Sequence, residues 1–203
     1  MSLPIKVLYW AEGPTDRAAA LALIKVAGVL PGPDYATRQK SVSGKDQLDK
    51  KMPAYNAAAA HEPFLLIRDL DDDADCAPSF LTETKTEIAR FMCFRIAVRS
   101  LEAWLMADAE ALAKWLHVNA ARVPAAPENL ENPKQALLAL VRESTSKDIK
   151  SDLLPSPKSG RQIGPLYAAR LQEFIRESWD IRRTVPLVGR LLLKKRSDAC
   201  SEQ

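Results

Sequence analysis

The chain has few residues that could form disulfides or bind soft metal ions. Its three cysteines, Cys76, Cys93 and Cys200, are an odd number at unrelated spacings, so they predict neither a disulfide framework nor a Cys-x-x-Cys metal pair. With only two histidines, His61 and His117, a zinc site is not expected either. These absences are typical of a protein from a reducing compartment, and we expect it in the cytoplasm.

Long hydrophobic runs are absent as well. No stretch approaches 18 uninterrupted apolar residues, so we expect no membrane-spanning helix and no membrane partner. The first residues enter a strand-like run directly and lack the charged and apolar regions of a signal peptide. The 203 residues, of which 47% are hydrophobic, suffice for one sizeable core.

Charge is distributed unevenly along the chain. Residues 1–133 carry 15 Lys or Arg and 18 Asp or Glu, hence a net charge of −3, whereas residues 134–203 carry 14 and 8, hence +6. An acidic part followed by a basic part suits a metal site flanked by a surface for polyanions. The alternative is a solvated helical surface.

The hydrophobic pattern predicts a parallel α/β sheet. Short apolar runs at 5–10, 64–69 and 92–98 predict strands, and a weaker strand is expected near 35–42 within a turn-rich stretch. Strands that alternate with helices in this order predict a parallel sheet with crossover helices.

Helices are predicted between and after these strands, at about 14–27, 46–60, 78–91, 102–116, 134–144, 166–179 and 181–193. Residues 119–133 contain three prolines and predict a loop, and residues 145–164 predict a polar, mobile segment. We therefore divide the chain into an α/β domain at 1–118 and a helical extension at 119–203, packed on the first domain.

An acidic stretch follows the central strand. Residues 64–73 read Phe-Leu-Leu-Ile-Arg-Asp-Leu-Asp-Asp-Asp. In an extended chain Asp69 and Asp71 point the same way, about 6–7 Å apart along the backbone, which suits a hard cation such as Mg²⁺. The alternative is a solvated acidic turn.

Two further strand ends carry carboxylates. Glu12 lies in the turn after the first strand, and Asp16 follows four residues later at the start of a helix. Ser100 and Glu102 follow the strand at 92–98. Taken singly, Glu12 could be an exposed turn residue, Asp16 a helix cap and Glu102 a helix-start carboxylate.

The carboxyl ends of parallel strands meet at one edge of a sheet, so these carboxylates are expected to converge. Five carboxylates close together repel one another unless cations neutralise them. Oxygen-only ligands favour Mg²⁺ or Mn²⁺, and two such ions can clamp the attacking and leaving oxygens of a phosphodiester.

The motifs, in this order, resemble a Toprim domain, the α/β module of topoisomerases, bacterial primases, recombination-repair proteins and overcoming-lysogenization-defect nucleases. The resemblance rests on Glu12-Gly13 with Asp16, on Asp69-Leu70-Asp71 and on Ser100-Leu101-Glu102. The Ser-x-Glu motif resembles the nuclease branch. The stretch from Arg99 to Asp108 is also similar to small stand-alone Toprim-like proteins of unassigned function.

The resemblance implies roles for the matching residues. Glu12 and Asp16 would hold one ion, and Asp69, Asp71 and Glu102 would hold a second, with Ser100 in support. The nuclease branch also places a lysine near the scissile phosphate, for which Lys134 is the first candidate and Lys158 the second. The catalytic set implied is Glu12, Asp69, Asp71 and Lys134.

Three functional hypotheses follow. The first is a metal-dependent nuclease that acts on nucleic acid, expected to be DNA, with phosphate contacts from Arg161, Arg170, Arg182, Arg183, Arg190 and Lys194. The second is a metal- and nucleic-acid-binding regulatory module that needs a protein partner such as an ATPase, because most nucleases of this branch carry an ATPase domain that this chain lacks. The third is another phosphoryl-transfer enzyme with Asp69 as nucleophile.

Overall fold

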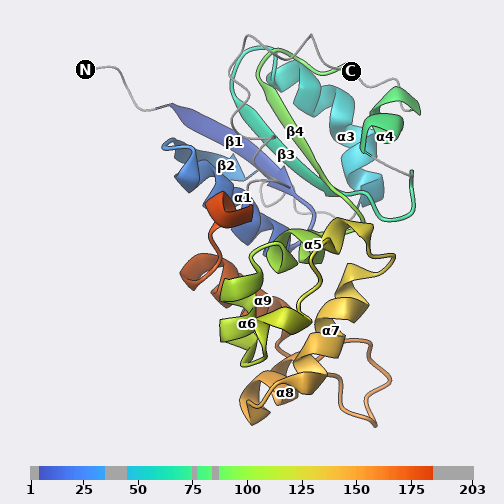
Figure 1. Cartoon of the computed structure of the whole chain (residues 1–203). Helices are drawn as coiled ribbons and strands as arrows, with labels where there is room; N and C mark the ends of the chain where they lie inside the picture. Colours follow the sequence, from blue (N-terminus) through green and yellow to red (C-terminus); the bar gives the residue numbers. More distant parts are fainter. Residues whose placement is uncertain (1–4, 35–44, 75–76, 84–86, 185–203) are drawn as a thin grey trace.

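The computed structural model describes residues 5–34, 45–74, 77–83 and 87–184. Its centre is a sheet of four parallel strands in the order β2-β1-β3-β4 (Figure 1). The strands are Lys6–Ala11 (β1), Leu30–Asp34 (β2), Phe64–Asp69 (β3) and Met92–Ala97 (β4). Helices connect the consecutive strands, so the expected parallel α/β sheet with crossover helices is confirmed.

The helices fall into two groups, one between the strands and one after them. The first group is Pro14–Val26 (α1), Lys45–Ala58 (α3) and Ala77–Glu83 (α4). The second is Leu101–Met106 (α5), Ala109–Leu116 (α6), Pro133–Glu143 (α7), Lys147–Leu153 (α8) and Tyr167–Glu177 (α9). Short 3-10 helices lie at Ala120–Arg122 (η1), Pro127–Asn129 (η2) and Ile181–Thr184 (η3).

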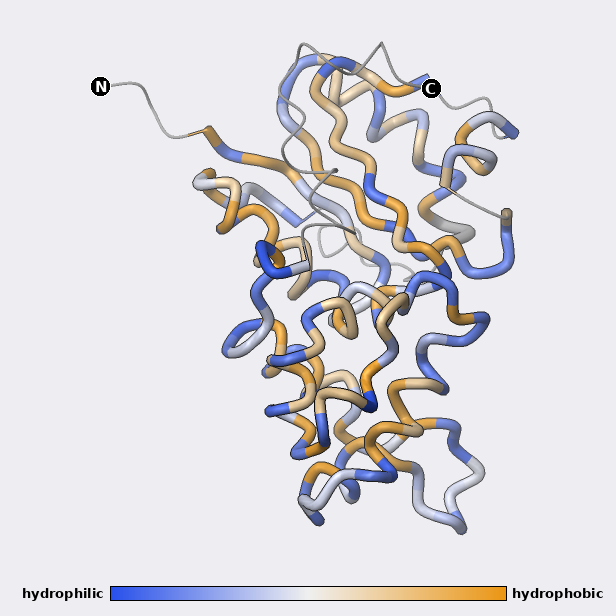
Figure 2. The backbone as a smooth tube through the Cα atoms, in the orientation of Figure 1, coloured by the Kyte–Doolittle hydropathy of each residue, from blue (hydrophilic) through white to orange (hydrophobic). Residues whose placement is uncertain are grey.

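Strand β3 is buried on both faces, as its unbroken apolar run predicts. Leu65 and Ile67 pack in the cluster that contains α1, whereas Phe64 and Leu66 pack with residues of α3. Side chains that alternate along an extended chain produce this division. The hydropathy-coloured tube shows the same apolar strands at the centre of the sheet (Figure 2).

The later helices share a core with the sheet. One hydrophobic cluster contains residues of β1, α1 and β3 together with residues of α5 to α9, and α9 packs against α1. Gly164 sets the approach to α9, because a Cβ at this position would clash with the carbonyl oxygen of Asp152. Its N–H donates to the carbonyl of Leu153 at 2.9 Å.

Strand β2 lies earlier in the sequence than we expected. The predicted weak strand near 35–42 falls outside the described residues, and the structure has a strand at Leu30–Asp34 instead. This strand contains Pro31 and Pro33, which signal a turn in sequence. It is an edge strand, where prolines are tolerated because one side makes no ladder hydrogen bonds.

Two helix predictions are also corrected. The helix expected at 78–91 ends at Glu83, and residues 87–91 are not helical: the Asn56 side chain bonds the carbonyl of Glu87 at 2.6 Å and the amide of Ala89 at 2.7 Å. The segment at 145–164, which we expect to be polar and mobile, contains helix α8. Helix α8 buries two residues that lie one turn apart on the same face, Ile149 and Leu153.

The helix predicted at 181–193 begins as η3, and its later part lies outside the described residues. Within the described part of the chain, none of the helices is long and apolar enough to cross a membrane.

Candidate active site at the carboxyl edge of the sheet

The backbones of β3 and β4 stay side by side beyond the ends of the strands. Asp69 is in register with Ala97, the amide of Leu70 donates to the carbonyl of Ala97, and the amide of Asp71 donates to the carbonyl of Arg99, both at 2.8 Å. The acidic stretch after β3 is therefore tied to the segment that leads into α5.

This edge contains unusual backbone geometry. Asp71 has φ = 50° and Arg99 has φ = 60°, both in the left-handed region that residues other than glycine seldom occupy. The extended geometry from which we expected Asp69 and Asp71 to point the same way is therefore wrong at Asp71. Such conformations cost about 1 kcal/mol or more each and cluster at functional sites.

Asp16 lies in the first turn of α1. The amide of Gly13, the N-cap residue, donates to its Oδ2 at 3.0 Å, so the helix-cap role considered for Asp16 is present in the structure. Burial raises the pKa of Asp16 against the lowering effect of this hydrogen bond, and the charge of Glu102 raises it further while Lys134 lowers it. Asp16 therefore lies within electrostatic reach of α5 and α7.

Asp69 is the centre of the predicted carboxylates. Burial raises the pKa of Asp69 well above its usual range, and the charges that add to this effect are those of Asp16, Glu102, Asp71 and Glu12. The structure thus brings all five predicted carboxylates into one electrostatic cluster.

Two polar atoms at this edge lack partners. The buried Oδ1 of Asp69 and the buried Oγ of Ser100 form no hydrogen bond with any of the described residues. Buried polar atoms of this kind are rare and require an explanation.

Glu102 is the least exposed of the five site carboxylates. It lies in the first turn of α5, its residue is 7% exposed, and the hydroxyl of Tyr167 donates to its Oε1 at 3.0 Å. Burial, and then the neighbouring Glu102 charge, raises the pKa of Tyr167 above its usual range, so the hydroxyl keeps its proton. Sequence reasoning missed Tyr167, because its position on the apolar face of α9 predicts a core residue.

Of the two candidate lysines, Lys134 lies at this edge. Its Nζ is 4.0 Å from Oε1 of Glu102, and its side chain is 47% exposed. Lys158 is exposed in the segment between α8 and α9. The structure therefore brings together Lys134 and the carboxylates.

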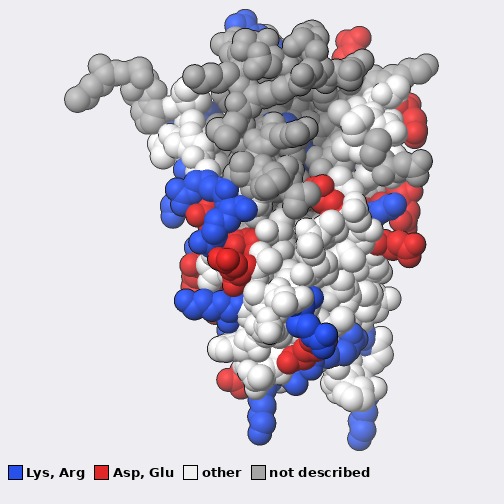
Figure 3. All heavy atoms as spheres, viewed as in Figure 1, with Lys and Arg blue, Asp and Glu red and all other residues white. Residues whose placement is uncertain are grey.

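Among the predicted phosphate-binding arginines that the structure describes, Arg170, Arg182 and Arg183 are paired with carboxylates. Arg161 is exposed, whereas Arg170 is paired with Asp152 and Glu173, each at 2.7 Å. In Figure 3, the acidic and basic side chains that are visible gather in a few patches, in several of which the two kinds lie beside one another. Arg190 and Lys194 lie outside the described residues.

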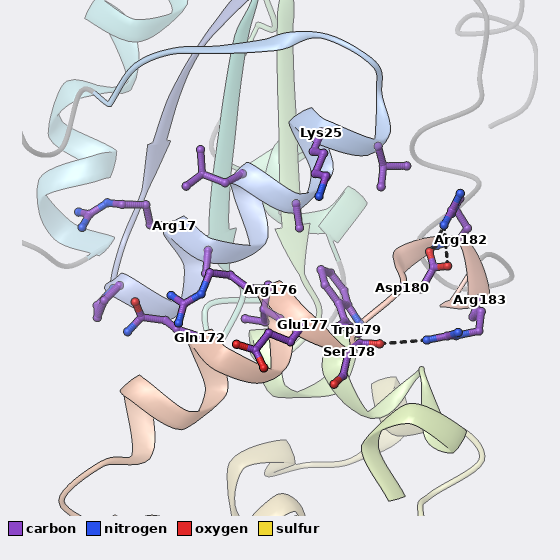
Figure 4. Close-up of a pocket in the computed structure, with 16 residues that line it drawn as sticks. Arg17, Lys25, Gln172, Arg176, Glu177, Ser178, Trp179, Asp180, Arg182 and Arg183 are labelled. Atoms are coloured by element: carbon purple, nitrogen blue, oxygen red, sulfur yellow. Dashed lines mark hydrogen bonds and ion pairs between the residues drawn. The ribbon is translucent and has the colours of Figure 1, made fainter. Parts of the chain in front are cut away.

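A groove of about 850 Å³ is lined by residues of α1, α9 and η3 (Figure 4). Five cationic side chains line it, from α1, α9 and η3: Arg17, Lys25, Arg176, Arg182 and Arg183. Three of them are paired within the chain: Arg17 with Asp34, Arg182 with Asp180, and Arg183 with Asp108. Much of the positive charge of the groove is thus already neutralised.

The donor chemistry of the acidic edge fits a hard divalent cation, because its donors are carboxylate oxygens and one of them, Oδ1 of Asp69, is buried without a partner in the part of the chain that the structure describes. Within the described ranges, however, no three His, Cys, Asp or Glu side chains are close enough to form a ready coordination shell. The carboxylates are gathered, but they are not arranged as ligands around one point.

A comparison of the chain with protein-family models, curated proteins and solved structures finds no match.

Proposed function

We propose that this chain is a Mg²⁺- or Mn²⁺-dependent, nuclease-like Toprim protein that acts on nucleic-acid phosphodiesters. The observation that supports this most is the cluster around Asp69, to which four other carboxylates from three separate segments contribute charge. The helix cap accounts for Asp16 but not for the other carboxylates, because like charges gathered in this way lower the stability of the protein when no cation is bound.

Each residue has a distinct part in this proposal. Glu12 and Asp16 hold one ion, and Asp69, Asp71 and Glu102 hold the other, with Ser100 in support. When bound, the ions supply charge neutralisation and activation of the attacking water. Lys134, exposed beside Glu102, presents its ammonium group to the scissile phosphate.

The substrate in this proposal is DNA, held partly by Arg161 and by basic residues of the carboxy-terminal part. The proposed location is the cytoplasm, in keeping with a chain that has only three cysteines.

The proposal is tested with Asp69→Asn, which keeps the shape of the side chain and removes its charge. We expect Mn²⁺ titration calorimetry to show lost binding, and plasmid nicking to fall by at least about 10³-fold, because the removed charge acts directly on the metal. Asp148→Asn, an exposed change on α8, is the matched control and should behave as wild type. Nicking that persists in Asp69→Asn would contradict the proposal.

One observation favours a second candidate function. Because no three site carboxylates of the described residues form a ready metal shell, this candidate uses a partner such as an ATPase, or the bound nucleic acid, to assemble the site. Such a regulatory module would bind metal weakly on its own, and it would cleave nucleic acid only when its partner is present. Full nicking by the pure chain would exclude it.

A further inference from the structure

We propose that Tyr167 is a positioning residue of this site, and that its hydroxyl fixes the Glu102 carboxylate so that one oxygen is held by the protein and the other is offered to the metal. This inference rests on the proposed function. It assigns to the helical part of the chain a direct role in building the metal site, beyond contacts to nucleic acid.

The contact is enclosed and joins distant parts of the sequence. Tyr167 is 4% exposed and Glu102 is 7% exposed, and the hydroxyl donates to Oε1 at 3.0 Å across 65 positions of sequence. Helix α9, which carries Tyr167, packs against α1, which carries Asp16. The hydrogen bond thus links α9 to the same edge that the other carboxylates occupy.

Physical chemistry explains why a donor is needed at this point. A carboxylate taken out of water loses solvation and needs hydrogen bonds in return. The phenol supplies one such hydrogen bond, to Oε1. We assign the second oxygen, Oε2, to the ion, because residues that hydrogen-bond a ligating carboxylate orient it for the metal.

Lys134 approaches the same oxygen from the exposed side. Its Nζ is 4.0 Å from Oε1, so the buried phenol and the exposed ammonium group share one acceptor. Both residues lie in the helical part that follows residue 118. The carboxylates thus come from the part of the chain before residue 118, and α7 and α9 set the orientation of Glu102.

The test is Tyr167→Phe, which keeps the aromatic ring and removes only the hydroxyl. We expect a folded protein whose Mn²⁺ affinity, measured by calorimetry, falls by about 10–100-fold. Plasmid nicking should fall at limiting Mn²⁺ and recover at saturating Mn²⁺, whereas Asp69→Asn should not recover. The matched control is Tyr55→Phe, a buried tyrosine on the α3 side of the sheet, which should keep wild-type Mn²⁺ affinity.

A double-mutant cycle separates positioning from a general loss of packing. In a Glu102→Gln background, Tyr167→Phe should have no further effect on Mn²⁺ affinity, because the group that Tyr167 positions has already lost its charge. An equal effect in both backgrounds would overturn the inference.

The two proposals fail in different ways. Wild-type Mn²⁺ affinity in Tyr167→Phe, together with lost binding in Asp69→Asn, would overturn the role of Tyr167 and leave the metal site standing. A wild-type chain that binds no Mn²⁺ and nicks no DNA, alone or with nucleic acid added, would overturn both.

Discussion

Two neighbouring residues of β3, Arg68 and Asp69, lie in opposite electrostatic surroundings. Arg68 is 2% exposed, and its guanidinium donates to both oxygens of Asp49 at 3.1 and 3.0 Å and to Asp73 at 2.6 Å. It also lies 4.3 Å from the ring centroid of Phe80. Asp69, in contrast, lies within electrostatic reach of four carboxylates, and its Oδ1 has no hydrogen-bond partner among the described residues.

The contrast distinguishes charges that are paired and hold the fold together from like charges that are gathered at the proposed site. Around Arg68 opposite charges are matched by bidentate hydrogen bonds, which is how a buried guanidinium is held in a protein. Around Asp69 like charges are gathered, which costs stability. The same strand therefore carries a stabilising cluster on one side and a destabilising one on the other. Arg68 also bonds the carbonyl of Asp69 at 2.7 Å, so the first cluster supports the second.

The largest expected effect on stability comes from Arg68→Ala. It removes the guanidinium that pairs with Asp49 and Asp73 and that lies over the ring of Phe80. Because both aspartates are partly exposed, we expect a loss of about 2–3 kcal/mol in the free energy of unfolding, below the usual range for a buried pair. Urea denaturation measures it.

At a pH above the raised pKa of Asp69, the same measurement on Asp69→Asn should show a metal-free protein at least as stable as wild type, because a repelling charge is gone. If both variants lost stability equally, the distinction between the two clusters would not hold. Arg68→Lys serves as the control that keeps the charge and loses the bidentate fork.

A change in pH should have a medium effect on the free energy of unfolding. Burial, and then neighbouring carboxylates, raises the pKa of Asp69, so the folded chain holds this proton more tightly than the unfolded chain. The metal-free protein should therefore lose stability as pH rises from about 4 through the raised pKa, by about 1.4 kcal/mol for each unit of difference. Thermal unfolding across this range measures it.

Two controls sharpen the pH prediction. Asp69→Asn should flatten the decrease in stability with rising pH. Added Mn²⁺ should reverse this decrease, because the ion favours the ionised carboxylates. A metal-free wild-type protein that gains stability over this range would contradict the cluster as we describe it.

The smallest expected effect is on the salt dependence of DNA binding, which should differ between two surface arginines, Arg161 and the ion-paired Arg170. If Arg161 contacts phosphate, Arg161→Ala should reduce the salt dependence of DNA binding by about one unit of slope. Arg170→Ala should change it less, because Arg170 is already bound to Asp152 and Glu173. Fluorescence anisotropy at several salt concentrations measures both, and equal slopes would remove the distinction.

Sequence patterns predicted the parts of the fold that local rules control. Strands β1, β3 and β4 are apolar runs with sharp polar ends, and the rule that parallel strands end at one edge was enough to bring Glu12, Asp69 and Glu102 together.

The remaining features depend on tertiary context. Strand β2 contains two prolines, which are tolerated because the strand lies at the edge of the sheet. Helix α8 has only two buried residues to mark its apolar face. The left-handed backbone at Asp71 is associated with its bond to Arg99, which no local pattern shows. Tyr167 contacts Glu102 from 65 positions away.

The tight junction at Gly164 has a consequence for mutational screens. This glycine lies only three positions before Tyr167, and any side chain there would have to push the chain away from Asp152. A displaced α9 would carry the phenol with it. A saturation screen scored by DNA cleavage should therefore rank Gly164 among the intolerant positions, although it holds no chemistry of its own and would be overlooked by a search for reactive side chains.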